Sequence, residues 1–144
     1  MTASGQGLGN VFNVIANASG ISIPLTRAES VAFVSWEDDG STILTVTEVD
    51  STGTNSEQAL DVTFTPHKSP GVGGTWTAMA EQDDTVDLGD DTTNDAMYID
   101  VQASQLSDGY DSVQCTTDGT QLMAIVYDLH TQRSPANLAS NIVA

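Results

Sequence analysis

Apolar and polar residues alternate along most of the chain after residue 25, and this period of two predicts β-strands with one buried and one solvent-facing side. The clearest case is the segment 60–65, where Leu60, Val62 and Phe64 alternate with Asp61 and two threonines. Similar segments separated by turn residues predict seven or eight strands, seven of them over residues 29–37, 42–50, 60–65, 76–80, 97–103, 110–116 and 121–130.

Two of these segments are apolar on both faces. In the segment 29–37, Ala32, Val34 and Trp36 lie on one face and further apolar side chains lie on the other. The segment 121–130 is likewise apolar on both faces. Apolarity on both faces is typical of a strand in the middle of a packed sandwich. We therefore expect Trp36 in the core.

Turn residues divide the strands. Asp-Gly pairs at 39–40, 108–109 and 118–119 predict tight turns, because glycine tolerates the positive φ that such turns require. Pro66 ends the strand before it, and the segment 67–74 is expected to be a long connection without regular structure. The whole pattern predicts an all-β fold, a single β-sandwich of immunoglobulin-like or jelly-roll type with essentially no helix.

The two ends of the chain differ from the sandwich domain, which is expected over residues 26–130. Residues 1–25 are small, polar and glycine-rich around one apolar patch, and predict an N-terminal arm or a first edge strand. Residues 131–144 leave the sheet at Pro135 and predict a C-terminal arm or a short helix. If both ends are arms that bind a partner, a chain lacking residues 1–20 is expected to fold but to lose that binding.

Charge narrows the classes of function. Twenty Asp and Glu oppose three Lys and Arg, for a net charge of −17. Such a surface repels nucleic acid, which needs a basic patch, and anionic membrane surfaces. No apolar run approaches the roughly 18 residues of a membrane span, and no secretory signal is expected. The acidic bias suits a halophilic host or a high-GC actinobacterial one, and the sequence does not choose between them.

The densest group of candidate metal ligands lies in the segment 81–95, which is expected to be a loop. Carboxylate oxygens in a flexible loop suit Ca²⁺, but the spacing lacks the glycine and the glutamate of an EF-hand loop. We therefore expect a solvated loop that binds no metal. Its aspartates are Asp83, Asp84, Asp87, Asp90, Asp91 and Asp95.

The other candidate catalytic and metal-binding residues are scattered. His67, His130 and Cys115 do not have the spacing of a zinc site. Cys115, the one cysteine, excludes an intramolecular disulfide and is expected to be buried, while His130 is expected at the surface. No nucleophile elbow or phosphate-binding glycine motif is present, so neither an enzymatic activity nor a cofactor is expected. Trp76 is expected in the core or as a ring that stacks on a sugar.

The C-terminal part of the chain resembles a known family. The segments that carry the resemblance are YIDV at 98–101, LSDGYDSV at 106–113, LMAIVYDL at 122–129 and QRSPANL at 132–138. Through them, residues 96–140 resemble the small capsid decoration (cement) proteins of tailed phages. The resemblance implies a virion structural protein that binds the outer surface of an HK97-type head, stabilises it, and is assembled in the host cytoplasm. Its partners are then the major capsid protein and copies of itself, as a trimer, and it has no catalytic residues.

The apolar residues of the two ends are expected to contact the capsid and neighbouring subunits, since exposed apolar ends on an acidic domain need a partner. Arg27 and Arg133 are expected to pair with acidic groups on the capsid. The expected contact residues are Val11, Phe12, Val14, Ile15, Ile21, Ile23, Arg27, Arg133, Leu138, Ile142 and Val143. The alternative, in which both ends pack on their own sandwich as edge strands, stays open.

A second function class fits the same sequence. This is a β-sandwich binding module for carbohydrate or for a host surface, displayed for example on a virion fibre. A row of exposed aromatic side chains on one sheet face would favour this alternative.

Overall fold

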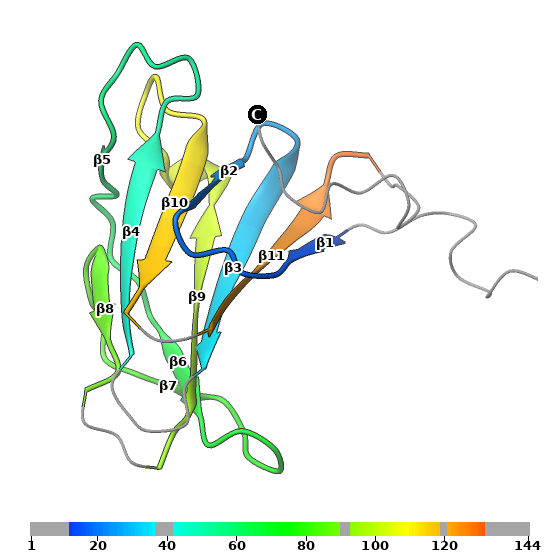
Figure 1. Cartoon of the computed structure of the whole chain (residues 1–144), viewed down its shortest axis with the longest axis vertical. Coiled ribbons are helices and arrows are strands. Elements are labelled where there is room, and N and C mark those ends of the chain that lie inside the picture. The colour runs from blue at the N-terminus through cyan, green and yellow to red at the C-terminus, as the bar shows by residue number, and fades with distance from the viewer. Residues whose placement is uncertain (1–11, 37–41, 90–92, 119–120, 132–144) are drawn as a thin grey trace, which may run out of the picture.

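The computed structural model describes residues 12–36, 42–89, 93–118 and 121–131, which form two antiparallel sheets packed against each other as a β-sandwich (Figure 1). The expected all-β class is confirmed. The strands are β1 (Phe12–Ile15), β2 (Ile21–Pro24), β3 (Ala28–Trp36), β4 (Ile43–Val49), β5 (Gln58–Ala59), β6 (His67–Ser69), β7 (Thr77–Ala78), β8 (Thr85–Asp87), β9 (Ala96–Gln102), β10 (Ser112–Thr117) and β11 (Gln121–Leu129), with one 3₁₀ turn at Ala103–Gln105.

The strand pairing is nested. One sheet has the order β1-β11-β3-β9-β6-β7, and the other has the order β2-β10-β4-β5, with β8 also paired to β4. Thus β1 pairs with β11, β2 with β10, β3 with β9 and β4 with β8. This is a long antiparallel hairpin rolled so that its strands alternate between two sheets, which is the connectivity of a jelly roll. Of the two sandwich types predicted, the jelly roll is the one observed.

The core lies between the two sheets and is built by strand alternation. Phe33 of β3 is opposite Ala124 of β11 and Ile99 of β9, and all three side chains are fully buried. From the facing sheet, β10 contributes Val113 and Cys115, which are also fully buried. The expected burial of Cys115 is confirmed.

The N-terminal segment is part of the sandwich. Ile15 of β1 and Ile23 of β2 are 1% and 0% exposed, and the backbone N–H of Ala18, between these strands, donates to the carbonyl of Leu122 at 2.9 Å. The arm expected over residues 1–25 is therefore wrong for residues 12–25, and the edge-strand alternative is the one observed.

This changes the expected effect of a truncation. A chain lacking residues 1–20 loses all of β1 and one buried isoleucine, so we expect any domain that it forms to be less stable than the full chain. The second expected arm, residues 132–144, lies outside the described residues.

Three loop-region expectations also differ from the structure. The connection expected at 67–74 begins with strand β6, and the acidic loop contains strand β8. The strand expected over 60–65 is not formed, although Leu60 and Phe64 are buried and Phe64 makes one isolated bridge to Gln82. Strands β6 and β8 pair with β9 and β4, which are distant in sequence, so the local pattern does not show them.

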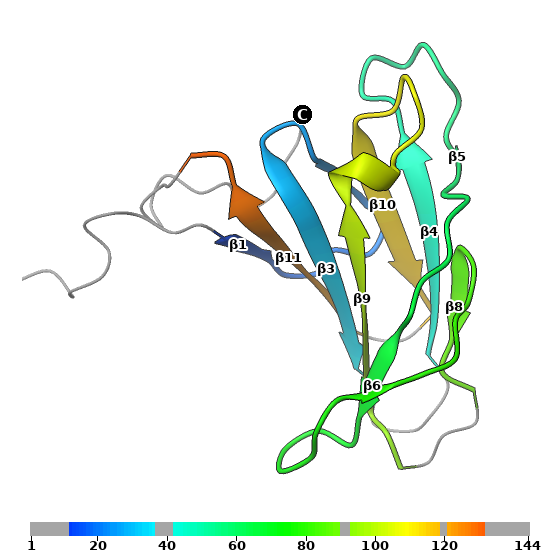
Figure 2. The same cartoon turned by 180° about the vertical axis from the view of Figure 1, so that it is seen from behind.

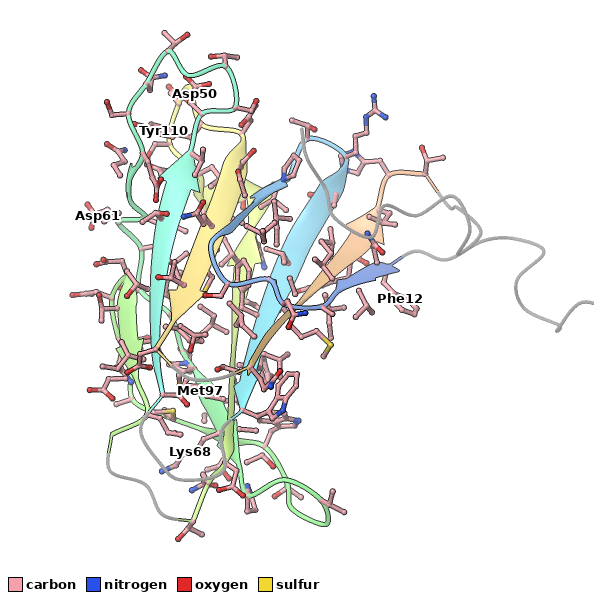
Figure 3. All side chains as sticks on the ribbon, viewed as in Figure 1. Phe12, Asp50, Asp61, Lys68, Met97 and Tyr110 are labelled. Carbon is pink, nitrogen blue, oxygen red and sulfur yellow. The ribbon has the colours of Figure 1, made fainter. Side chains whose placement is uncertain are left out.

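Buried carboxylates hold the loops at one end of the sandwich, where Figure 3 labels Asp50. Glu48 is fully buried and accepts a hydrogen bond from the backbone N–H of Ser107 at 2.8 Å. Asp50 accepts hydrogen bonds from the Thr52 hydroxyl and from the backbone N–H groups of Asn55 and Thr52. These bonds favour the charged form and lower the pKa of Asp50 to about 2.

Candidate docking surface

The two outer faces of the sandwich differ in chemistry. On the five-stranded sheet, the central outward residues carry hydroxyl and amide groups, and Thr47 donates to the Glu57 carboxylate at 2.7 Å. Ile43 and Val49 lie at the two ends of β4 and are half-buried. The polar residues of this face include Ser22, Thr45, Thr47, Gln114 and Thr116.

The outward face of the six-stranded sheet is apolar and aromatic; Figure 2 turns the molecule to the side opposite that of Figure 1. Alternation within the strands and their register place on this face Phe12, Val14, Ala32, Val34, Trp36, Tyr98, Met123, Ile125 and Tyr127. We call these residues the apolar face. All five exposed large hydrophobic side chains of the described residues, Phe12, Val14, Trp36, Val72 and Trp76, belong to this sheet or to the loop between β6 and β7.

Charge is sparse on the apolar face. Asp100 of β9 lies on this face and accepts a hydrogen bond from the Tyr127 hydroxyl at 2.8 Å, and the exposed Asp128 follows Tyr127 in β11. Desolvation and this bond to Asp100 raise the pKa of Tyr127, so the phenol stays neutral. On a chain of net charge −17 this face is the region best suited to lose its water to a partner.

The β1 edge forms one half of the face. Phe12 and Val14 are 44% and 45% exposed, and they lie opposite Tyr127 and Ile125 of β11. Figure 3 shows the Phe12 side chain at this edge of the molecule. The row of Val14 and Ile125 continues to Ala32 on β3, whereas the row of Phe12 and Tyr127 ends at Ser30.

The part of the sheet from β3 to β7 carries an aromatic corner, which we define as His67, Trp76, Tyr98 and Trp36. The His67 and Tyr98 rings stack with centroids 5.0 Å apart, and the Trp76 ring meets Tyr98 edge-on at 4.8 Å and 85°. Trp36 is 41% exposed, so its expected place in the core is wrong. Its strand is central within its sheet, but the described residues leave the outward face of that strand partly open.

Of the predicted contact residues that the structure describes, some are exposed and others are buried in the core. Phe12 and Val14 are exposed on the apolar face and Arg27 is exposed beside the start of β3, whereas the side chains of Ile15 and Ile23 are in the core and Ile21 packs against it. The remaining predicted residues, Val11, Arg133, Leu138, Ile142 and Val143, lie outside the described residues.

Sequence reasoning missed other members of the apolar face, above all Ile125 and Tyr127. The signal that pointed to them was the apolarity of both faces of residues 121–130. It was interpreted as burial of both faces, whereas it marks one buried face and one partly exposed face.

The remaining candidate residues form no reactive centre in the described part of the chain. Burial raises the pKa of the Cys115 thiol, which suppresses its thiolate. His130 is at the surface, as expected, with Nε2 at 2.8 Å from the Glu29 carboxylate. Over the described ranges no three His, Cys, Asp or Glu side chains gather as metal ligands; Asp90 and Asp91 lie outside these ranges.

The same described residues include no helix long and apolar enough to cross a membrane. No family model matches this chain. No curated protein matches it either. Among solved structures, the Yersinia pseudotuberculosis-derived mitogen is similar over 94% of this chain and 99% of its own, with 10% sequence identity and a TM-score of 0.32. A likeness of this size carries no argument about function.

Proposed function

We propose that this protein is a virion structural protein, a capsid decoration subunit that binds the outer surface of an HK97-type head and stabilises it. The observation that carries the proposal is the difference between the two outer faces, since one is apolar and almost free of charge while the other is polar. The C-terminal resemblance to phage decoration proteins points to the same role. The jelly roll is also a recurrent fold of viral capsid domains, which supports the proposal by analogy alone.

In this proposal the β1 half of the apolar face binds the major capsid protein. Phe12 and Val14 are each about half exposed, so burying the rest of each side chain contributes on the order of 1 kcal/mol. Arg27, exposed at the start of β3, pairs with an acidic group of the capsid. The polar sheet and the acidic loops then face solvent, where net charge keeps particles apart.

The test uses heads assembled from the major capsid protein encoded in the same genome. Purified protein is cosedimented with these heads, and bound copies are counted for the wild type, for Phe12→Ser with Val14→Thr, and for Thr116→Ala on the polar sheet. The proposal expects saturable binding that falls at least about tenfold in the double variant and is unchanged in Thr116→Ala. Full decoration by the double variant would overturn the assignment of the β1 edge, and no binding by the wild type would overturn the role itself.

Self-association as a trimer is part of the same proposal. The net charge of −17 opposes trimer formation in dilute buffer, so we expect the trimer to form on the head, where capsid contacts hold subunits side by side. Cryo-electron microscopy of decorated heads tests this, because density at the local three-fold axes is expected and isolated single copies would contradict it.

A second candidate function is favoured by one specific observation. The exposed aromatic rings at the β6–β7 edge suit a β-sandwich binding module for carbohydrate or a host surface. A gene neighbourhood without capsid, portal and head protease genes would favour this module over the decoration role.

A further inference from the structure

Both tryptophans of the chain lie away from β1, one on a central strand of the six-stranded sheet and the other beside its β7 edge. Trp36 ends β3, and Trp76 precedes β7, the outermost strand at this edge, with Tyr98 of β9 on the strand next to β3. The indoles are 41% and 46% exposed. Such large apolar rings left open to water mark a binding surface.

We propose that the aromatic corner binds a neutral saccharide, a chain of β-linked pyranose rings. In such sugars the axial C–H groups make a flat apolar face, which matches the face of an indole ring, while the hydroxyl groups point outward from the ring edge. A sheet surface that presents two indoles on one side fits an extended, ribbon-like sugar chain. This inference goes beyond attachment to a capsid and does not depend on it.

Three rings of the corner, those of His67, Tyr98 and Trp76, pack on one another before any ligand binds. Tyr98 is fixed in the centre of the sheet between Val34 and His67, and its ring packs against both His67 and Trp76. The segment that leads to Trp76 is shaped by a turn in which the Gly74 N–H donates to the Gly71 carbonyl at 3.0 Å. Rings that are already ordered lose little conformational entropy on binding.

Polar groups suited to sugar hydroxyls border the rings. Gln121 is the cross-strand partner of Trp36 and is exposed, so its amide is accessible beside the indole. Aromatic surface with a few adjacent polar groups is the usual make-up of a small-molecule site.

The net negative charge of the protein favours neutral saccharides over acidic ones. A protein of net charge −17 repels sulfated, uronic or phosphorylated chains at moderate ionic strength. A neutral sugar meets no such barrier, and the aromatic corner itself contains no carboxylate. The chemistry of the corner therefore favours neutral glucose or N-acetylglucosamine polymers over acidic ones.

Tryptophan fluorescence provides a direct assay, since both indoles of the chain belong to the site. The full chain is titrated with cellohexaose and with chitohexaose, and dextran sulfate serves as the anionic control. We expect a saturable change in emission with at least one neutral hexasaccharide and none with dextran sulfate. Trp76→Ala is expected to weaken binding, measured by calorimetry, at least about tenfold, while Trp76→Phe retains most of it.

Phe12→Ala, at the opposite edge, is the matched control and is expected to bind sugar like the wild type. Each variant is first checked by far-ultraviolet circular dichroism, so that loss of fold is not mistaken for loss of binding. No change in emission with either neutral hexasaccharide up to about 10 mM, or equal affinity in Trp76→Ala and the wild type, would overturn the proposal. Neither result bears on head binding, which is read from Phe12 and Val14.

Discussion

Strand β1 contributes both to the core and to the apolar face, and the neighbouring residues Ile15 and Val14 allow the two contributions to be tested separately. Their side chains point to opposite faces of the sheet: Ile15 is 1% exposed in the core, and Val14 is 45% exposed on the apolar face. We therefore expect Ile15→Ala to lower stability and Val14→Thr to lower head binding, each with little effect on the other property.

The magnitude for Ile15→Ala follows from burial. The substitution removes three buried carbons at about 0.8 kcal/mol each, or about 2.4 kcal/mol, and the cavity left in the core raises the loss to about 3 kcal/mol. Val14→Thr keeps the β-branched shape and places its hydroxyl beside water, so its cost is under about 1 kcal/mol.

The assay is urea unfolding followed by far-ultraviolet circular dichroism, with thermal unfolding as a second readout. For a chain of this length a loss of about 3 kcal/mol corresponds to a fall in Tm of about 6–12 °C. An Ile15→Ala variant within about 0.5 kcal/mol of the wild type would refute the reasoning, because it would mean that β1 contributes nothing to the core and behaves as a detached arm.

Three further predictions concern charge and burial. The pKa of Asp50 is about 2, below its ordinary 3.8, so the ionised Asp50 carboxylate stabilises the fold fully above about pH 4. This stabilisation is lost as the pH falls towards 2. The urea midpoint of the wild type should therefore fall between pH 4 and pH 2, and that of Asp50→Asn should fall less. Added NaCl should raise the urea midpoint by screening the net charge of −17, and a falling midpoint would contradict this. The buried Cys115 thiol should react with Ellman's reagent at least about 100-fold faster in urea than in the folded protein, and equal rates would show that it is accessible.

The local pattern of the chain was sufficient to predict the strands whose two faces contrast or are uniformly apolar. Alternation placed β3, β4, β9, β10 and β11 close to their observed bounds, and it identified Cys115 as a core residue. This works because the direction of a side chain from a strand is a local property of the backbone with a fixed period of two. The charge and the lack of reactive motifs were likewise properties of the sequence alone.

Tertiary structure decided which strands pair and which faces stay open. The short strands β1, β6 and β8 have too few residues to show a period, and each is stabilised by a partner distant in the chain, as when Phe12 pairs with Tyr127. The burial of Trp36 likewise could not be predicted from the local sequence. The alternation of its strand predicts the face of the sheet on which Trp36 lies. Whether that face is covered depends on which segments pack over the sheet, and only the folded structure shows this.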